Sequence, residues 1–161
     1  MKKNNIYRYP KTVREVIEGQ RHYVIDHSHI TEKLPSVTTI LSATQSEEKR
    51  ESLQRWRERV GEEEATRIVD QSGARGTAMH KILEKYILEE GYLDETEVGK
   101  QAHNMALRVI EQGLCNVPEY FGTECTLYYP GLYAGQTDLV ALHKNDIAII
   151  DFKQTNKPKK R

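Results

Sequence analysis

The chain has 161 residues, of which 24 are Lys or Arg and 24 are Asp or Glu, so its formal net charge is zero. This length fits one domain, and no apolar run approaches the roughly 20 residues that a membrane-spanning helix needs. The two cysteines are too few for a disulfide framework. Zero net charge argues against a protein that coats nucleic acid through bulk charge.

The balance of charge is uneven along the chain. Residues 1–21 hold six basic and two acidic residues, and residues 153–161 hold five basic residues and no acid. Residues 84–97 instead hold six acids and one lysine. Such runs are typical of solvated helix faces and frayed ends.

The N-terminal region predicts a small hairpin followed by a short helix. Residues 12–18 and 20–26 are rich in β-branched residues and tyrosine and flank Gly19, which is typical of two strands joined by a tight turn. Ser36 can cap a short helix that carries Val37 and Ile40.

Helical patterns follow from residue 44 to residue 113. Thr44 and Glu47 have the spacing of a capping box and predict a helix that starts near Gln45 and ends near Gly61. Trp56 has the period of a core residue on this helix. Residues 62–70 look like a short continuation.

The next two helices are better marked. Pairs of apolar residues repeat every four positions over residues 73–90, and Gly91 stands where a helix-ending glycine is expected. Asp94 and Glu97 then predict the start of a helix that ends at Gly113.

After residue 113 the apolar period becomes that of β-structure. Residues 122–129, 132–142 and 147–152 read as three strands separated by turn residues. A hairpin, then helices, then a three-stranded meander predicts an α+β fold.

The last two strands carry acidic residues that alternation places on one face. Asp151 and Lys153 share a face of the final strand. A two-residue turn at residues 144–145 puts Asp138 directly opposite Asp151, whereas a four-residue turn puts it opposite Lys153. An odd loop would separate them, and a structural Asp–Lys pair on a solvated face remains the alternative to a site.

Two facing carboxylates repel each other, and an apolar setting keeps both ionised only if a positive charge lies between them. Hard oxygen ligands of this kind suit Mg²⁺ or Mn²⁺. Such a cation can lower the pKa of a bound water and stabilise a phosphorane, while Lys153 orients the water or neutralises phosphate charge. These residues therefore predict metal-dependent hydrolysis of phosphodiesters.

Several motifs together indicate a family. The segments 135–138 (GQTD) and 150–153 (IDFK) resemble the core of the PD-(D/E)xK nucleases, and 75–80 (RGTAMH) resembles the upstream motif of their RecB-like branch. With 34–38 (LPSVT), Arg55-Trp56 and 154–159 (QTNKPK), the pattern is similar to the mitochondrial genome maintenance exonuclease subgroup and its phage and bacterial relatives. The resemblance runs from about residue 34 to the end of the chain.

The resemblance implies a fold, an activity and a set of site residues. The fold is a restriction-endonuclease-like core, a mixed β-sheet with an antiparallel meander flanked by helices. The activity is a Mg²⁺- or Mn²⁺-dependent exonuclease that prefers single-stranded DNA. The implied metal ligands are His80, Asp138, Asp151 and the carbonyl of Phe152; Lys153, Asp138, Asp151 and Glu124 are the implied catalytic residues. Arg75, Gln154, Lys157 and Lys159 are expected to contact DNA.

The motifs also imply an organisation. We expect one nuclease domain over residues 1–161, with a hairpin region (1–33), a helical part (34–113), the catalytic meander (114–153) and a basic tail (154–161). The family continues into a further helix, which this sequence lacks, so we expect a truncated site floor. No signal peptide is visible, which suits a cytoplasmic protein of a bacterium or a phage-infected cell, acting as a monomer.

Two other functions remain open. The same residues would serve an endonuclease or a flap-processing nuclease. A catalytically silent DNA-binding module would bind DNA but not degrade it when Mn²⁺ is present.

Overall fold

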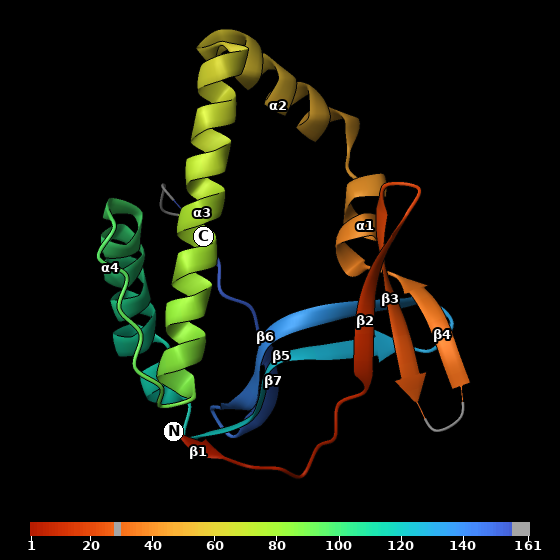
Figure 1. Cartoon of the computed structure of the whole chain (residues 1–161), viewed down its shortest axis with the longest axis vertical. Coiled ribbons are helices and arrows are strands. Elements are labelled where there is room, and N and C mark those ends of the chain that lie inside the picture. Colours follow the sequence, from red (N-terminus) through yellow and green to blue (C-terminus); the bar gives the residue numbers. More distant parts are fainter. Residues whose placement is uncertain (28–29, 156–161) are drawn as a thin grey trace.

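The computed structural model describes residues 1–27 and 30–155, and within them the chain forms an α+β fold (Figure 1). A mixed sheet has the strand order β1-β5-β6-β7, and a second, antiparallel sheet has the order β2-β3-β4. Four α-helices accompany the two sheets. The predicted fold class, with a mixed sheet, an antiparallel meander and flanking helices, is confirmed.

The predicted meander forms most of the mixed sheet. It consists of β5 (Glu119–Tyr129), β6 (Tyr133–His143) and β7 (Asp146–Ile150), and β1 (Lys2–Lys3) pairs with β5 in parallel. Lys144 and Asn145 make a two-residue turn with positive φ angles of 51° and 70°, as a type I′ hairpin requires. His143 therefore pairs with Asp146, which is the register that the two-residue turn predicts.

The second sheet contains the predicted hairpin and one strand that the sequence pattern did not reveal. The hairpin is β2 (Lys11–Ile17) and β3 (Gln20–His27), and β4 (Ile30–Pro35) adds to it. Pro35 ends β4, where its missing N–H costs no ladder bond. Tyr23, Ile25 and Leu34 pack with Ala134 of β6, and this small core joins the two sheets.

The first two helices form as a pair joined by a short loop. Ser36 caps α1 (Val37–Ala43), and its hydroxyl accepts a hydrogen bond from the Thr39 N–H at 3.0 Å, as predicted. The expected start of the next helix is wrong by two residues: α2 spans Glu47–Val60 and Ser46 is its N-cap. Thr44 instead donates its hydroxyl to the Ile40 carbonyl at the end of α1.

The prediction that Trp56 belongs to the core is also wrong. No residue of α2 is buried, and Trp56 is half-exposed beside Arg55 and Arg59. Figure 1 shows why: α2 spans from α1 to the far end of the next helix and lies away from both sheets. An apolar period alone does not reveal whether a partner surface exists.

The third helix is much longer than predicted. α3 runs without a break over Glu62–Ile87, so the expected short helix and its neighbour are one element. Gly73 lies inside it, where a glycine costs about 1 kcal/mol relative to alanine but does not end a helix. The left-handed residue after its end is Glu89, with φ of 57°, and not the expected Gly91.

The fourth helix agrees with the predicted end. α4 spans Glu97–Gln112 and ends at Gly113, and a 3₁₀ turn (Leu114–Asn116) leads into β5. Its N-cap is Thr96, whose hydroxyl oxygen accepts from the Gly99 N–H at 3.0 Å. Asp94, two residues earlier, is not the cap itself. Its carboxylate accepts hydrogen bonds from the Thr96 N–H and hydroxyl and so orients the capping residue.

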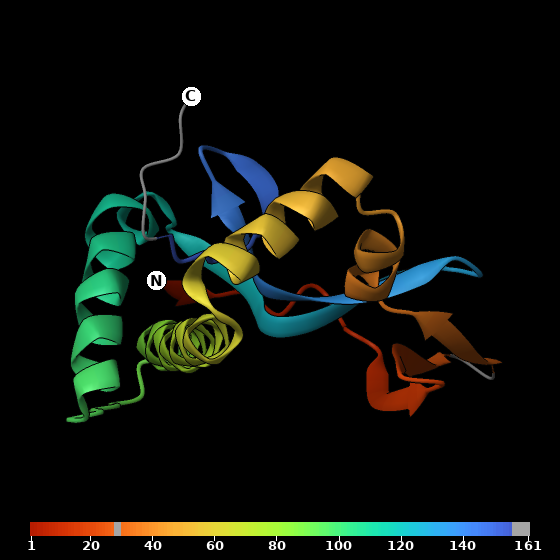
Figure 2. The ribbon, with the colours of Figure 1, turned by 90° about the horizontal axis from the view of Figure 1, so that it is seen from above.

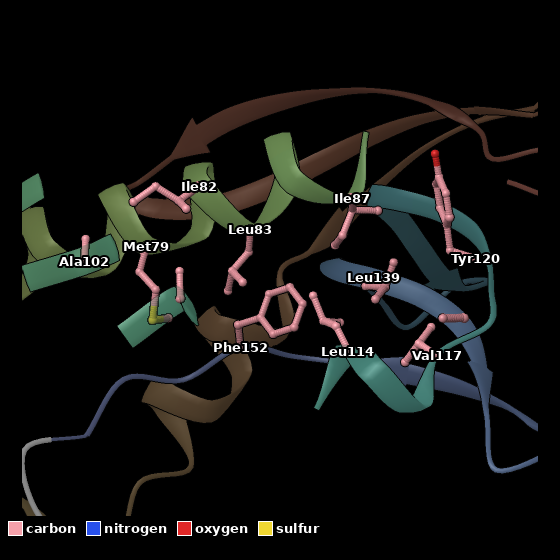
Figure 3. Close-up of a cluster of buried hydrophobic side chains, with 12 residues drawn as sticks. Met79, Ile82, Leu83, Ile87, Ala102, Leu114, Val117, Tyr120, Leu139 and Phe152 are labelled. Carbon is pink, nitrogen blue, oxygen red and sulfur yellow. The ribbon is translucent and has the colours of Figure 1, made fainter. Parts of the chain in front are cut away.

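The largest core holds α3 against the mixed sheet. Met79, Leu83 and Ile87 on one stripe of α3 meet Leu139 of β6 and Phe152 after β7 (Figure 3). α4 packs on the side of α3 that faces away from the sheet, as Figure 2 shows in a view along the axis of α3. The packing of α3 on the sheet sets the distance between them, and so the position of the polar residues beside the apolar stripe of α3.

Within the described residues, no helix is long and apolar enough to cross a membrane.

The core position of Leu83 gives a first prediction. Leu83 is fully buried, so Leu83→Ala should lower the free energy of unfolding by about 2–5 kcal/mol. Leu53 of α2 is 50% exposed, and Leu53→Ala should cost less than about 1 kcal/mol. Urea unfolding followed by circular dichroism measures both; equal losses would contradict the assignment of the core.

Candidate metal centre

Three elements bring a histidine and two carboxylates together. His80 comes from α3, Glu124 from β5 and Asp138 from β6, and one potential ligand atom from each lies within 4.8 Å of the others. The three side chains line a cavity of about 600 Å³ at the edge where α3 meets the sheet. His80 is adjacent in sequence to the buried Met79, so the packing that anchors the apolar stripe of α3 also fixes the position of the His80 imidazole.

Asp138 is the most firmly held of the three. Its Oδ1 is 3.1 Å from Nδ1 of His80, and its Oδ2 accepts a hydrogen bond from the Phe152 N–H at 2.5 Å. The Phe152 ring is buried in the main core and lies edge-on to the His80 ring, with centroids 6.3 Å apart. The carboxylate therefore links α3, β6 and the segment after β7.

Glu124 has an unusual backbone for a strand residue. Its φ is +50° in the middle of β5, a left-handed conformation that costs a non-glycine residue about 1–2 kcal/mol. Its carbonyl oxygen accepts a hydrogen bond from the side chain of Gln136 at 3.0 Å. Such outliers persist only where the surrounding structure enforces them, and they cluster at functional sites.

The electrostatics of the three residues are coupled. Burial raises the pKa of Glu124, and the charges of Asp138 and Glu84 raise it further. Burial also acts to raise the pKa of Asp138, but the hydrogen bonds from His80 and the Phe152 N–H outweigh it and lower that pKa. The hydrogen bond to Asp138 raises the pKa of His80. Of the two carboxylates, the surroundings therefore favour the ionised form of Asp138 and disfavour that of Glu124.

The donor set fits a hard or borderline divalent cation. Two carboxylates and one imidazole nitrogen are ligands that Mg²⁺, Mn²⁺ and related ions accept. A cation between Glu124 and Asp138 would offset both the burial of the Glu124 carboxylate and the repulsion from Asp138, which together raise the pKa of Glu124. The residues that would hold it are His80, Glu124 and Asp138.

Asp151 and Lys153 lie close to each other but outside this group of three. The Lys153 ammonium donates to Asp151 Oδ1 at 3.0 Å, and both side chains are more than half exposed. Asp151 lines a different cavity, beside Tyr133 and Ile149. Ile150 and Phe152 face the core, as the alternation predicts. A direct role of Asp151, Lys153 or the Phe152 carbonyl at the metal stays a prediction.

Arg75 and Gln154 form an anchor between α3 and the segment after β7. Arg75 Nε donates to Gln154 Oε1 at 2.9 Å, and Gln154 donates its amide to the Ser72 carbonyl. The Gln154 amide lies so close to Gly76 that a Cβ there would be 2.9 Å from its nitrogen. These contacts support a positioning role beside the predicted contact with DNA. Lys157 and Lys159 lie outside the described residues.

Pattern reasoning missed other residues of the cavity. Arg14 and Arg21 of the hairpin and Lys81 of α3 line it together with the candidate ligands. Strand alternation does place Arg14 and Arg21 on one face of the hairpin. The sequence carries no signal that this face turns toward α3, because the turn depends on how the two sheets pack.

Comparison with curated proteins finds the mitochondrial genome maintenance exonuclease 1 of Mus musculus, which is 29% identical to this chain over 133 residues. The alignment covers 78% of this chain but only 38% of the mouse protein, so the chain spans well under half of that relative's length. No family model matches the chain. The chain is thus distantly similar to a protein of the subgroup that its motifs indicate. Membership of the PD-(D/E)xK superfamily stays a prediction.

Glu124→Gln tests the coupling between charge and metal. A raised pKa means that ionisation of Glu124 destabilises the fold as pH rises above about 4.3, its ordinary value. In EDTA the variant should therefore melt at a higher temperature than the parent at pH 7, and this gain should vanish near pH 4. Mn²⁺ affinity should fall by at least about tenfold, since even outer partners of a metal ligand are worth that much.

Thermal unfolding at both pH values and calorimetric titration with Mn²⁺ measure these effects. Glu111→Gln, on the exposed face of α4, is the matched control and should change neither. An unchanged Mn²⁺ affinity in Glu124→Gln would exclude Glu124 as a ligand.

Gln154→Ala tests the anchor. The variant loses the hydrogen bonds to Ser72 and Arg75, each worth about 0.5–1.5 kcal/mol, so amides of residues 151–155 should exchange with solvent about tenfold faster. Hydrogen–deuterium exchange measures this, with Gln112→Ala on α4 as control. Unchanged protection of the segment would show that Gln154 does not hold it.

Proposed function

We propose that the chain is a divalent-metal-dependent deoxyribonuclease that acts as an exonuclease and prefers single-stranded DNA. The observation that carries this proposal is the convergence of His80, Glu124 and Asp138 within 4.8 Å at one cavity. The similarity to a protein named as an exonuclease supports a nuclease function. Mg²⁺ and Mn²⁺ are the proposed cations.

We infer the roles of individual residues from their contacts. A bound cation would supply charge neutralisation at a phosphoryl oxygen and lower the pKa of water. The contact between Asp138 and Nδ1 of His80 fixes the orientation of the imidazole ring, and Nε2 then remains as the ring nitrogen that would bind a cation. Lys153, paired with Asp151 at the exposed end of the segment, would neutralise charge on a DNA phosphate.

A cavity beside Asp151 supports the preference for single strands. It has a volume of about 390 Å³ and contains Tyr129 and Tyr133, whose ring centroids are 6.1 Å apart. Both rings are exposed. Aromatic faces of this kind stack on unpaired bases, whereas bases inside a duplex are already stacked.

The proposal is tested with end-labelled single-stranded, double-stranded and circular single-stranded DNA, each incubated with Mn²⁺ or with EDTA. We expect loss of label from linear single strands in Mn²⁺, slower loss from duplexes and an intact circle. Asp138→Asn should lower the rate by roughly 100-fold or more, the loss typical of removing one preorganised charged group. Asp146→Asn, at the exposed start of β7, is the matched control and should retain full activity.

Each alternative has its own signature in this assay. A cut circle would indicate an endonuclease. DNA binding without Mn²⁺-dependent cleavage would indicate a silent binding module, and would contradict the proposed activity.

A further inference from the structure

The hairpin β2–β3 presents one face to the mixed sheet. Cross-strand pairs join Thr12 to Ile25, Arg14 to Tyr23 and Val16 to Arg21, so these six residues share a face. Thr12 Oγ1 lies 2.9 Å from Thr126 Oγ1 of β5, which fixes the direction of that face. Figure 1 shows the hairpin lying across the β5–β6 pair.

The two ends of this face differ in character. At one end Tyr23 and Ile25 are buried against Leu34 and Ala134. Arg14 lies directly across from Tyr23, and Arg21 lies across from the exposed Val16 at the turn end of the same face. The two arginines therefore border the packed apolar residues of this face, on the side that lines the cavity.

Both arginines line the cavity that holds the candidate metal centre. In the part of the chain that the structure describes, neither forms an ion pair within 4.0 Å, although three acids line the same cavity. The Arg14 guanidinium lies 5.7 Å from the centroid of the Tyr23 ring, a cation–π contact that orients it. Neither guanidinium is thus tied up in an ion pair of the described residues, although the charge of Arg14 acts on Glu124 from a distance in the direction that lowers its pKa.

Unpaired guanidinium groups opposite a candidate metal centre suit one kind of ligand. Arginine presents a planar set of donors that matches the oxygens of phosphate. The acids of the cavity repel a polyanion, so a phosphate chain that enters needs cations other than the metal to hold it. The hairpin lies before Leu34, where the motifs of the family resemblance begin, so the resemblance assigns no role to these two arginines.

We propose that Arg14 and Arg21 form a phosphate clamp that holds the backbone of the DNA strand across the cavity from His80, Glu124 and Asp138. This inference rests on the proposed function for the identity of the ligand. The hairpin then closes one wall of the site, and the strand runs between β2–β3 and α3. Arg14 and Arg21 position the substrate and do not hold the metal.

The test compares Arg14→Ala/Arg21→Ala with Lys11→Ala/Lys33→Ala. The control pair removes the same charge from the opposite face of the same sheet, where Lys33 pairs with Glu15. Affinity for a fluorescent 20-nucleotide single strand is measured by anisotropy in Ca²⁺ over a series of NaCl concentrations. Calorimetric Mn²⁺ titration and thermal unfolding are measured on the same proteins.

The clamp variant should bind the strand about tenfold more weakly and show a salt slope smaller by about 1.4, the value for two phosphates of a single strand. Arg14→Lys/Arg21→Lys should recover most of the affinity, and the control pair should have a smaller effect on it. Mn²⁺ affinity should not fall, and the melting temperature should drop only slightly, through loss of the Arg14–Tyr23 contact. A mononucleotide added as competitor should displace the strand only weakly if the ligand is the backbone and not a single phosphate.

The outcomes separate this inference from the proposed function. Equal affinities and salt slopes for the clamp and control variants would overturn the clamp, even if the parent protein degrades DNA. A selective loss in the clamp variant would support the clamp even if the parent shows no cleavage, and in that case only the nuclease activity would fail. Effective competition by the mononucleotide would overturn recognition of the backbone.

Discussion

The arrangement of the candidate site depends on the two hydrogen bonds of Asp138. One carboxylate oxygen meets His80 of α3 and the other accepts the backbone N–H of Phe152. A buried carboxylate is costly unless its oxygens have partners, so the fold must deliver both donors to it. The donors come from elements 58 and 14 residues away along the chain. The main core therefore fixes the chemistry of the site, because it sets where α3 and Phe152 lie.

The same site contains features that oppose stability. Glu124 has a left-handed backbone, and burial and neighbouring acids raise its pKa. A protein under selection for stability alone would place a glycine or a neutral residue there. The side chain of Gln136, bound to the Glu124 carbonyl, helps to hold this conformation. The cost is intelligible if a cation occupies the space between Glu124 and Asp138, because the cation turns repulsion into attraction.

Local patterns predicted those parts of the fold whose cause is local. The Ser36 cap sets the start of α1, and the turn at Lys144–Asn145, one of the two lengths that the sequence allowed, sets the β6–β7 register, because each depends on a few adjacent residues. The length of α3 was not predictable from its glycines, since a single glycine costs a helix only about 1 kcal/mol and α3 continues through the exposed Gly73. The prediction that Trp56 belongs to the core was wrong because α2 has the apolar period of a buried face, but that face packs against no other surface of the described residues. The grouping of His80 with Glu124 and Asp138 depends on tertiary packing, and only the family resemblance pointed to His80.

The net charge of zero illustrates how coarse a bulk property is. It argues against a protein that coats nucleic acid, and the structure gives no reason to revise that narrow statement. What matters at the site is how the charges are arranged in space: the acids of the candidate metal centre line one cavity together with Arg14 and Arg21. An acidic centre alone would repel a polyanion, and a basic wall alone would bind one without placing a metal. Under the proposed function, together they would attract a phosphate chain to the point where a cation can act on it, and they would do so without any excess of positive charge in the chain as a whole.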